Sequence, residues 1–305
     1  REALDGDDTK KEELKKSIEA NGKAPEGQTA ATPGTVTTDK YKNVTEPDFK
    51  KADGSDDTER NEAAKKAKED YDKALEDAKT VNSDKNATQK AVDEAKAKLD
   101  AARKELDKYS TNKDKLNAAI AEHGHVYEYT NDTLNTLTVD QKLEKADPTY
   151  KNSTENEREA YDNALEDAIR LSADPNASQK DVNKAIEDLK DAKDALDKNA
   201  TDKAPLDSAV QKSFDNPDPT KPDKQSVFYK NAAAKKDTDA DAKKAVEDYD
   251  NAFAEAKRVL GDKNATNDDV KKAKEALEKA EEALHADKYQ TKDTDLAQAL
   301  ADNFS

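Results

Sequence analysis

Two histidines, His123 and His125, flank a glycine and are the first residues whose type and spacing suggest chemistry. Two imidazole nitrogens can bind a metal ion, but a zinc site takes three or four ligands. The one other histidine, His285, lies far along the chain. The chain has no Cys, which excludes thiolate metal sites, thiol nucleophiles and disulfides. We therefore predict no metal centre and no cofactor.

A second candidate site is the acidic series Asp237, Asp239 and Asp241, which imitates the first ligands of a calcium-binding loop. Such a loop needs Gly at its sixth position and Glu at its twelfth. Here those positions hold Ala242 and Asp248. The series therefore predicts the exposed start of a helix.

Carboxylates are too abundant for any pair of them to indicate catalysis. Asp and Glu number 70 against 53 Lys and Arg, and the net charge is -17. A catalytic acid needs a desolvated cleft that shifts its pKa, and slim Ala-rich helical bundles offer none. The sequence also has no nucleophile motif and no Gly-rich phosphate loop. We predict a protein that is not an enzyme and, given its acidity, one that binds no nucleic acid.

Tyrosine is the aromatic residue best suited to binding a ligand, because the chain has ten Tyr and no Trp. Tyr71, Tyr161 and Tyr249 fall on apolar helix faces and are predicted to lie in the core. Tyr127 and Tyr129 have no counterparts elsewhere in the chain. If one surface binds a partner, we expect it to be the loop that carries these two residues.

The tripeptide Asn-Ala-Thr/Ser occurs three times, starting at Asn86, Asn176 and Asn264. It fits an N-glycosylation sequon. Each copy also precedes a helical pattern, where a hydroxyl can accept a hydrogen bond from the free backbone N–H groups of the first turn. We favour the second interpretation, in which three hydroxyl residues cap the following helices: Thr88, Ser178 and Thr266.

The elements that carry these residues are amphipathic helices, because apolar residues recur at alternating steps of three and four. Each tripeptide precedes a helix C, such as the one carrying Val182, Leu189 and Leu196. Each Tyr-Asp segment forms a helix B, and a shorter helix A comes first in each repeat. No single helix can bury its apolar stripe alone, so three of them predict a small antiparallel bundle.

The helical patterns repeat along the chain. The Tyr-Asp segments begin at Tyr71, Tyr161 and Tyr249, at offsets of 90 and 88 residues. A fixed long period is the signature of a repeat array. We therefore predict an all-α fold of tandem three-helix bundles of about 90 residues, forming an elongated rod. The predicted divisions are residues 1–8 as the tail of a preceding repeat, 9–109 as repeat 1, 110–199 as repeat 2, 200–290 as repeat 3, and 291–305 as the first helix of a following repeat.

The connection from helix A to helix B varies most in length, and Gly and Pro are frequent in it. Length variation is typical of solvated loops. All three connections also contain Tyr-Lys-Asn, beginning at Tyr41, Tyr150 and Tyr229. We predict three surface loops.

The joints between repeats are short and contain no Gly, so we predict that they are partly ordered. Three threonines are expected to cap the next helix A: Thr111, Thr201 and Thr291. Tyr109 and Tyr289 are expected to wedge between neighbouring bundles, whereas Asn199 offers no comparable apolar area. The joint after repeat 2 should then be the loosest.

Composition agrees with several small cores instead of one large core. Hydrophobic residues make up 33% of the chain and charged residues 40%. No apolar run approaches the roughly 20 residues of a membrane span. We expect a monomer without membrane insertion in this segment, with any signal peptide or anchor outside it.

The residues of repeat 2 carry a family likeness, in the order Tyr150-Lys151-Asn152-Ser153, Ala160-Tyr161-Asp162-Asn163-Ala164, Asp174-Pro175-Asn176-Ala177-Ser178-Gln179 and then Val182 with a Leu-rich helix. This order resembles the FIVAR module, a three-helix unit found in tandem in Gram-positive cell-wall proteins, including giant matrix-binding proteins. The resemblance implies an extracellular, wall-attached stalk or adhesin segment with no catalytic residues. The alternative is that the repeats themselves bind a host matrix protein or glycan, which would require an exposed apolar or aromatic patch.

Overall fold

A computed structural model describes residues 9–22, 35–130, 133–213 and 226–290. The partial repeats predicted at 1–8 and 291–305 lie outside the described residues, as does the predicted cap Thr291. Within the described ranges the regular structure is helical, apart from one isolated antiparallel bridge between Lys50 and Asp56. The predicted all-α class is confirmed for this part of the chain.

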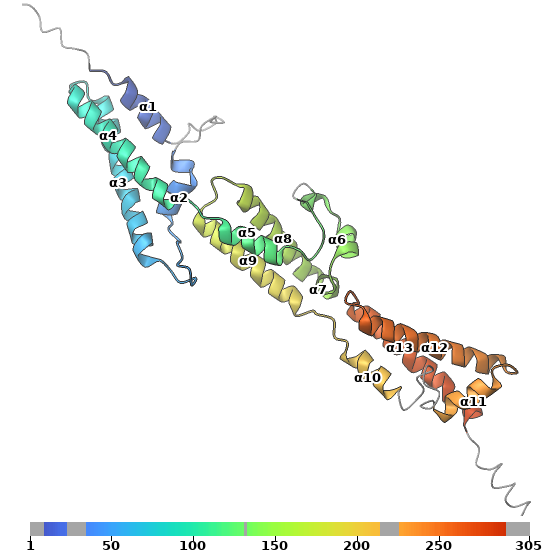
Figure 1. Cartoon of the computed structure of the whole chain (residues 1–305). Coiled ribbons are helices and arrows are strands. Elements are labelled where there is room, and N and C mark those ends of the chain that lie inside the picture. The colour runs from blue at the N-terminus through green and yellow to red at the C-terminus, as the bar shows by residue number, and fades with distance from the viewer. Residues whose placement is uncertain (1–8, 23–34, 131–132, 214–225, 291–305) are drawn as a thin grey trace, which may run out of the picture. The chain divides into compact units, whose positions relative to one another are not determined.

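The three predicted helices occur in every repeat (Figure 1). The first helices are short and the second and third are long. Helix A corresponds to α1 (Glu12–Asn21), α5 (Asp114–His123) and α10 (Ala204–Lys212); helix B to α3 (Thr58–Ser83), α8 (Glu155–Ala173) and α12 (Ala240–Gly261); helix C to α4 (Gln89–Leu106), α9 (Gln179–Asp197) and α13 (Asn267–Leu284).

The contacts divide the chain into two compact units. Unit 1 comprises 1–125, 129–137 and 159–194, and unit 2 comprises 126–128, 138–158 and 195–305. Repeat 1 therefore lies in unit 1 and repeat 3 in unit 2, while repeat 2 contributes to both. In unit 1, α3 and α4 pack side by side and α1 packs against both of them. In unit 2, α10 packs in the same way against α12 and α13.

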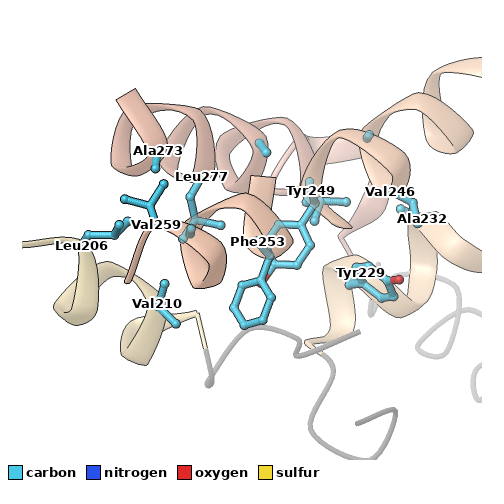
Figure 2. Close-up of a cluster of buried hydrophobic side chains, with 14 of the residues drawn as sticks. Leu206, Val210, Tyr229, Ala232, Val246, Tyr249, Phe253, Val259, Ala273 and Leu277 are labelled. Atoms are coloured by element: carbon cyan, nitrogen blue, oxygen red, sulfur yellow. The ribbon is translucent and has the colours of Figure 1, made fainter. Parts of the chain in front are cut away.

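The core of repeat 3 shows how these sequences bury enough apolar surface. Figure 2 shows Leu206 and Val210 of α10 facing the pair formed by α12 and α13. Tyr249 and Phe253 of α12 stack with their ring centroids 5.8 Å apart. Leu277 of α13 is fully buried. Aromatic and aliphatic side chains of this size supply most of the burial, because Ala contributes little apolar area.

The predicted loops between helix A and helix B are wrong in one respect, because each contains a short helix that carries Tyr-Lys-Asn. These helices are α2 (Asp39–Thr45), α7 (Pro148–Asn152) and α11 (Val227–Lys235), and repeat 2 adds α6 (Val139–Lys145). Helices α2, α7 and α11 have polar N-caps that bond the first turn, Thr38, Asp147 and Ser226. Such short helices carry little periodic signal, since they complete only one or two turns.

Each helix C begins at a hydroxyl residue of the Asn-Ala-Thr/Ser loop. Thr88 accepts a hydrogen bond from the Ala91 N–H at 3.2 Å, and Ser178 accepts one from Asp181 at 3.1 Å. Thr266 accepts one from the Asp269 N–H at 3.2 Å, and the Asp269 carboxylate accepts one in return from the Thr266 N–H at 2.9 Å. Hydrogen bonds from the Thr266 backbone N–H and the Thr266 hydroxyl lower the pKa of the Asp269 carboxyl.

Thr266→Ala is expected to lower the free energy of unfolding of repeat 3 by about 1 kcal/mol, because the first turn of α13 loses its cap. Thermal unfolding followed by circular dichroism measures this, with Thr266→Ser as the control that keeps the hydroxyl. Equal losses for the Ala and Ser variants would show that the cap contributes nothing.

Candidate functional site: the joints between repeats

The Tyr-Lys-Asn helices of repeats 1 and 3 are fixed to helix B through their tyrosines. In repeat 1 the Tyr41 hydroxyl donates to Asp72 at 3.0 Å, and the Tyr41 ring lies edge-on to Tyr71 with centroids 5.7 Å apart. In repeat 3 the Tyr229 hydroxyl donates to Asp250 at 3.1 Å, and its ring lies 5.9 Å from that of Tyr249. In these two repeats the Tyr-Asp pair of helix B thus positions the short helix, and with it the asparagine two residues after the tyrosine.

That asparagine joins repeat 1 to repeat 2. Asn43 is fully buried, and its side-chain amide donates to the Tyr109 carbonyl at 2.7 Å and to the Thr111 hydroxyl at 2.8 Å. Its carbonyl oxygen accepts a 2.6 Å hydrogen bond from the backbone N–H of Gln179, the first residue of α9. One side chain of repeat 1 therefore binds both the joint segment and a helix start of repeat 2.

The joint segment itself lies on the Asn-Ala-Ser loop of repeat 2. The Thr111 hydroxyl donates to the Ala177 carbonyl at 2.7 Å, and the Asn112 N–H donates to the Gln179 side chain at 2.8 Å. The Lys113 ammonium bonds the carbonyls of Ser172 and Asp174 at the end of α8. A cation is favourable there, because the last carbonyls of a helix are unpaired and carry partial negative charge.

The same arrangement recurs between repeats 2 and 3. The Asn152 amide donates to the Asn199 carbonyl at 2.9 Å and to the Thr201 hydroxyl at 3.0 Å. Its oxygen accepts from the N–H of Asn267, the first residue of α13, at 2.9 Å. Thr201 then donates to the Ala265 carbonyl at 2.7 Å. We call these two sets of contacts joint 1 and joint 2.

Joint 1 has further contacts from a hairpin at residues 46–57, which has no counterpart among the described residues of repeats 2 and 3. Gly54, at φ 88°, forms the tight turn of this hairpin, a conformation that favours glycine. The Asp48 carbonyl accepts a hydrogen bond from Asn183 of α9 at 2.6 Å, and Glu46 pairs with Lys180 at 2.6 Å. The hairpin thus contacts repeat 2 in addition to Asn43. These extra contacts at joint 1, and not a missing tyrosine, are a physical reason to expect joint 2 to be the looser joint.

A cavity of about 440 Å³ lies beside the hairpin, lined in part by Phe49, Arg60, Gln179 and Asn183. Arg60 lies over the Phe49 ring at 4.1 Å and donates to the Lys108 carbonyl. Gln179 and Asn183 bond within the joint. Because these polar groups already bond other groups of the protein, we take the joint, and not the cavity, as the candidate site.

The predicted caps Thr111 and Thr201 are wrong, because neither hydroxyl bonds the first turn of helix A. Helices α5 and α10 have no side-chain bond at their N-cap residues. Asn112 instead accepts from the Asp114 N–H at 2.7 Å, and Asp202 accepts from the Ala204 N–H at 3.0 Å. The threonines point to the neighbouring loop, where they hold the joint.

The predicted tyrosine wedge is also wrong. Tyr109 is 6% exposed and lies in the core of repeat 1, with its ring centroid 5.9 Å from that of Phe49. Tyr289 is 1% exposed and lies in the core of repeat 3. At joint 1 it is the backbone carbonyl of Tyr109 that takes part. Asn199, at the corresponding position of joint 2, also bonds Ser153 and Glu157 through its side chain at 3.0 and 3.3 Å.

The candidate ligand-binding loop does not expose its aromatic residues as expected. Tyr127 is 3% exposed and packs edge-on against Tyr150, with centroids 5.3 Å apart. Tyr129 is partly buried, its ring lies 6.4 Å from that of His125, and burial raises the pKa of its hydroxyl. A surface for aromatic stacking with a ligand requires an exposed ring, which Tyr127 lacks.

The carboxylates considered above as calcium ligands or catalytic acids cap a helix or form ion pairs in the structure. Among the described residues, no group of three or more His, Cys, Asp or Glu could bind a metal ion. Asp239 is the N-cap of α12 and accepts from the N–H groups of Asp241 and Ala242. Exposed carboxylates pair with lysines one turn away, as Asp188 does with Lys184 at 2.6 Å. The carboxylates in these pairs remain solvated.

The aspartates that accept the Tyr41 and Tyr229 hydrogen bonds differ in the charge that lies beside them. In repeat 1, Lys68 pairs with Asp72, the acceptor of the Tyr41 hydroxyl. One turn before Asp250 in repeat 3 stands Val246. Burial raises the pKa of the Asp250 carboxyl above its ordinary value of 3.8, although the Tyr229 hydrogen bond lowers it in part. Burial and the nearby Asp250 charge raise the pKa of Tyr229 to about 12.

Asp250→Asn is expected to stabilise repeat 3 by about 0.5 kcal/mol at neutral pH, the scale of a partly exposed charge interaction. Because the folded-state pKa of Asp250 is raised, its protonation stabilises the fold, and this contribution is lost as pH rises from 3.8 through the folded-state pKa. Amide exchange of α12 against pH measures it. Asp72→Asn is the control and should destabilise repeat 1; a gain in both variants would contradict the account.

Comparison with known proteins assigns these repeats to a family. The FIVAR domain model matches residues 41–107, 130–197 and 211–285. Each match contains one Tyr-Lys-Asn helix, one helix B and one helix C, while α1 and α5 lie outside the matched ranges. No curated protein and no solved structure matches the chain. Since the matches cover more than half of the sequence, the chain belongs to the FIVAR domain family.

Proposed function

We propose that this chain is a structural spacer, in which FIVAR domains connected by ordered joints hold another part of a bacterial cell-wall surface protein away from the wall. FIVAR domains form a non-catalytic repeat family and are typical of extracellular surface proteins. No described helix is long and apolar enough to cross a membrane.

The observation that carries the proposal is the repeated asparagine joint. A spacer must transmit orientation from one repeat to the next, which a free hinge cannot do. Asn43 and Asn152 each bond a carbonyl, a hydroxyl and a helix N–H that belong to two adjacent repeats or to the segment between them. Three hydrogen bonds fix one side-chain amide against both repeats and the segment between them, and therefore restrict rotation about the joint.

The alternative is that the repeats themselves bind a host matrix protein or glycan. A binding surface of that kind is expected to show a contiguous exposed apolar or aromatic patch. Among the described residues, the large hydrophobic side chains that are well exposed are Val139 and Val227, at 58% and 54%. Tyr127 is buried. These observations support the spacer more than the adhesin.

Small-angle X-ray scattering of the whole chain tests the proposal. Three bundles joined end to end, with helices of about 20 residues, should reach on the order of 100 to 150 Å. The double variant Asn43→Ala/Asn152→Ala should give a broader distribution of maximum dimensions at unchanged helix content. A compact particle, or identical curves for both proteins, would overturn the spacer.

A further inference from the structure

The segment before α1 lies on repeat 1 in the way that joint segments lie on repeats 2 and 3. The Thr9 hydroxyl donates to the Ala87 carbonyl at 2.9 Å, and the Lys10 N–H donates to the Gln89 side chain at 2.8 Å. The Lys11 ammonium bonds the carbonyls of Asn82 and Asp84. These contacts correspond one by one to those of Thr111, Asn112 and Lys113 on repeat 2. Repeat 1 therefore has the receiving half of a joint.

This receiving half differs from the completed joint 1 in its exposure, whereas Asn267 of the completed joint 2 is exposed as well. In repeat 2, Ser178 is 8% exposed and Gln179 9%, because Asn43 and its neighbours cover them. The corresponding Thr88 and Gln89 are exposed. Within the described ranges no acceptor bonds the Gln89 N–H, whose counterparts Gln179 and Asn267 bond an asparagine. The surface is thus preformed for a group that repeats 2 and 3 already hold.

The geometry of joints 1 and 2 defines the chemistry of that group. It must accept a hydrogen bond from a helix N–H and donate to the threonine hydroxyl at the same time. A carboxamide does both, whereas a carboxylate only accepts. In this chain the carboxamide is presented by the Tyr-Lys-Asn helix. Repeat 3 contains the corresponding giving half, since Asn231 donates to the Tyr289 carbonyl at 2.8 Å.

We infer that the end of repeat 1 formed by Thr9, Ala87, Thr88 and Gln89 is a docking surface for the Tyr-Lys-Asn helix of another FIVAR repeat, which completes a further joint there. The inference rests on the proposed function. The partner repeat is one that leads into Thr9 in the same polypeptide, because Thr9 and Lys10 already lie on repeat 1 as a joint segment does.

The experiment uses the full chain from Thr9 onward, preceded by an added copy of residues 110–200 that leads directly into Thr9. Amide exchange of Gln89 is measured by NMR. The added repeat should slow this exchange by about tenfold, the effect of one net hydrogen bond, and Asn152→Ala in the added copy alone should abolish the slowing. Equal exchange rates with Asn and Ala would overturn the inference.

Two further measurements distinguish a partner in the same polypeptide from a second copy, and failure of this inference from failure of the proposed function. If the chain as it exists dimerises in sedimentation equilibrium, and Asn231→Ala abolishes the dimer, the occupant is a second copy and the inference is overturned. A monomer at all concentrations, with Gln89 protected in the extended chain, assigns the partner to the same polypeptide. If Asn43→Ala exposes the Gln179 amide while Gln89 never responds to the added repeat, the proposed function stands and this inference fails.

Discussion

Asn43→Ala is expected to lower the free energy that couples repeat 1 to repeat 2 by about 2 to 4 kcal/mol, because three polar partners lose their hydrogen bonds at once. Asn43 is fully buried, so water can reach the Tyr109 carbonyl and the Gln179 N–H only if the joint opens. Removing one member of a buried polar set costs more than the average hydrogen bond contributes, since the remaining members stay desolvated.

Denaturant unfolding, with amide exchange assigned to each repeat, measures this coupling. Lys40→Ala is the matched control, because Lys40 lies on the same helix but pairs with Asp107 of its own repeat. The control should change stability by less than about 1 kcal/mol. If the Asn43 and Lys40 variants unfold alike, Asn43 does not couple the repeats.

Leu189→Ala is expected to lower the free energy of unfolding of repeat 2 by about 2 to 4 kcal/mol through lost burial and the cavity that remains. Leu189 is fully buried in α9, and its counterparts Leu99 and Leu277 are fully buried in α4 and α13. Small cores leave little margin, since a domain of this size is stable by only about 5 to 15 kcal/mol.

Thermal unfolding monitored by circular dichroism provides the measurement for this core variant. Glu187→Ala, on the exposed face of the same helix, should change the melting temperature little. A melting curve of Leu189→Ala that coincides with that of the control would place Leu189 outside the core, against the structure.

Helices B and C could be predicted from the sequence because their apolar stripes are long and regular. Val182, Leu189 and Leu196 recur at helical spacing, and all three are buried in α9. The same reasoning placed Tyr71, Tyr161 and Tyr249 in the core, and each is fully buried. An apolar stripe can be recognised within one stretch of sequence, because it depends on residues only three or four positions apart.

The sequence predicts partly ordered joints, but it does not indicate which residues form the hydrogen bonds across them. Thr111 stands just before a helix, so a local interpretation makes it a cap, whereas its hydroxyl bonds Ala177 in the next loop. Asn43 lies in a connection of variable length and bonds residues more than 60 positions away in the chain. Polar contacts over such separations leave no periodicity. The one available signal was the recurrence of Tyr-Lys-Asn in three otherwise dissimilar connections.

Distance distributions between spin labels across each joint test the central claim most directly. The chain has no cysteine, so Lys98→Cys with Lys190→Cys reports on joint 1, and Asp191→Cys with Lys271→Cys reports on joint 2. Both distributions should be narrow, and that of joint 2 should be the broader, because the described residues form no hairpin beside joint 2. Asn43→Ala should broaden the first distribution alone, and Asn152→Ala the second alone. Distributions that neither substitution changes would contradict the conclusion that asparagine holds the FIVAR repeats in order.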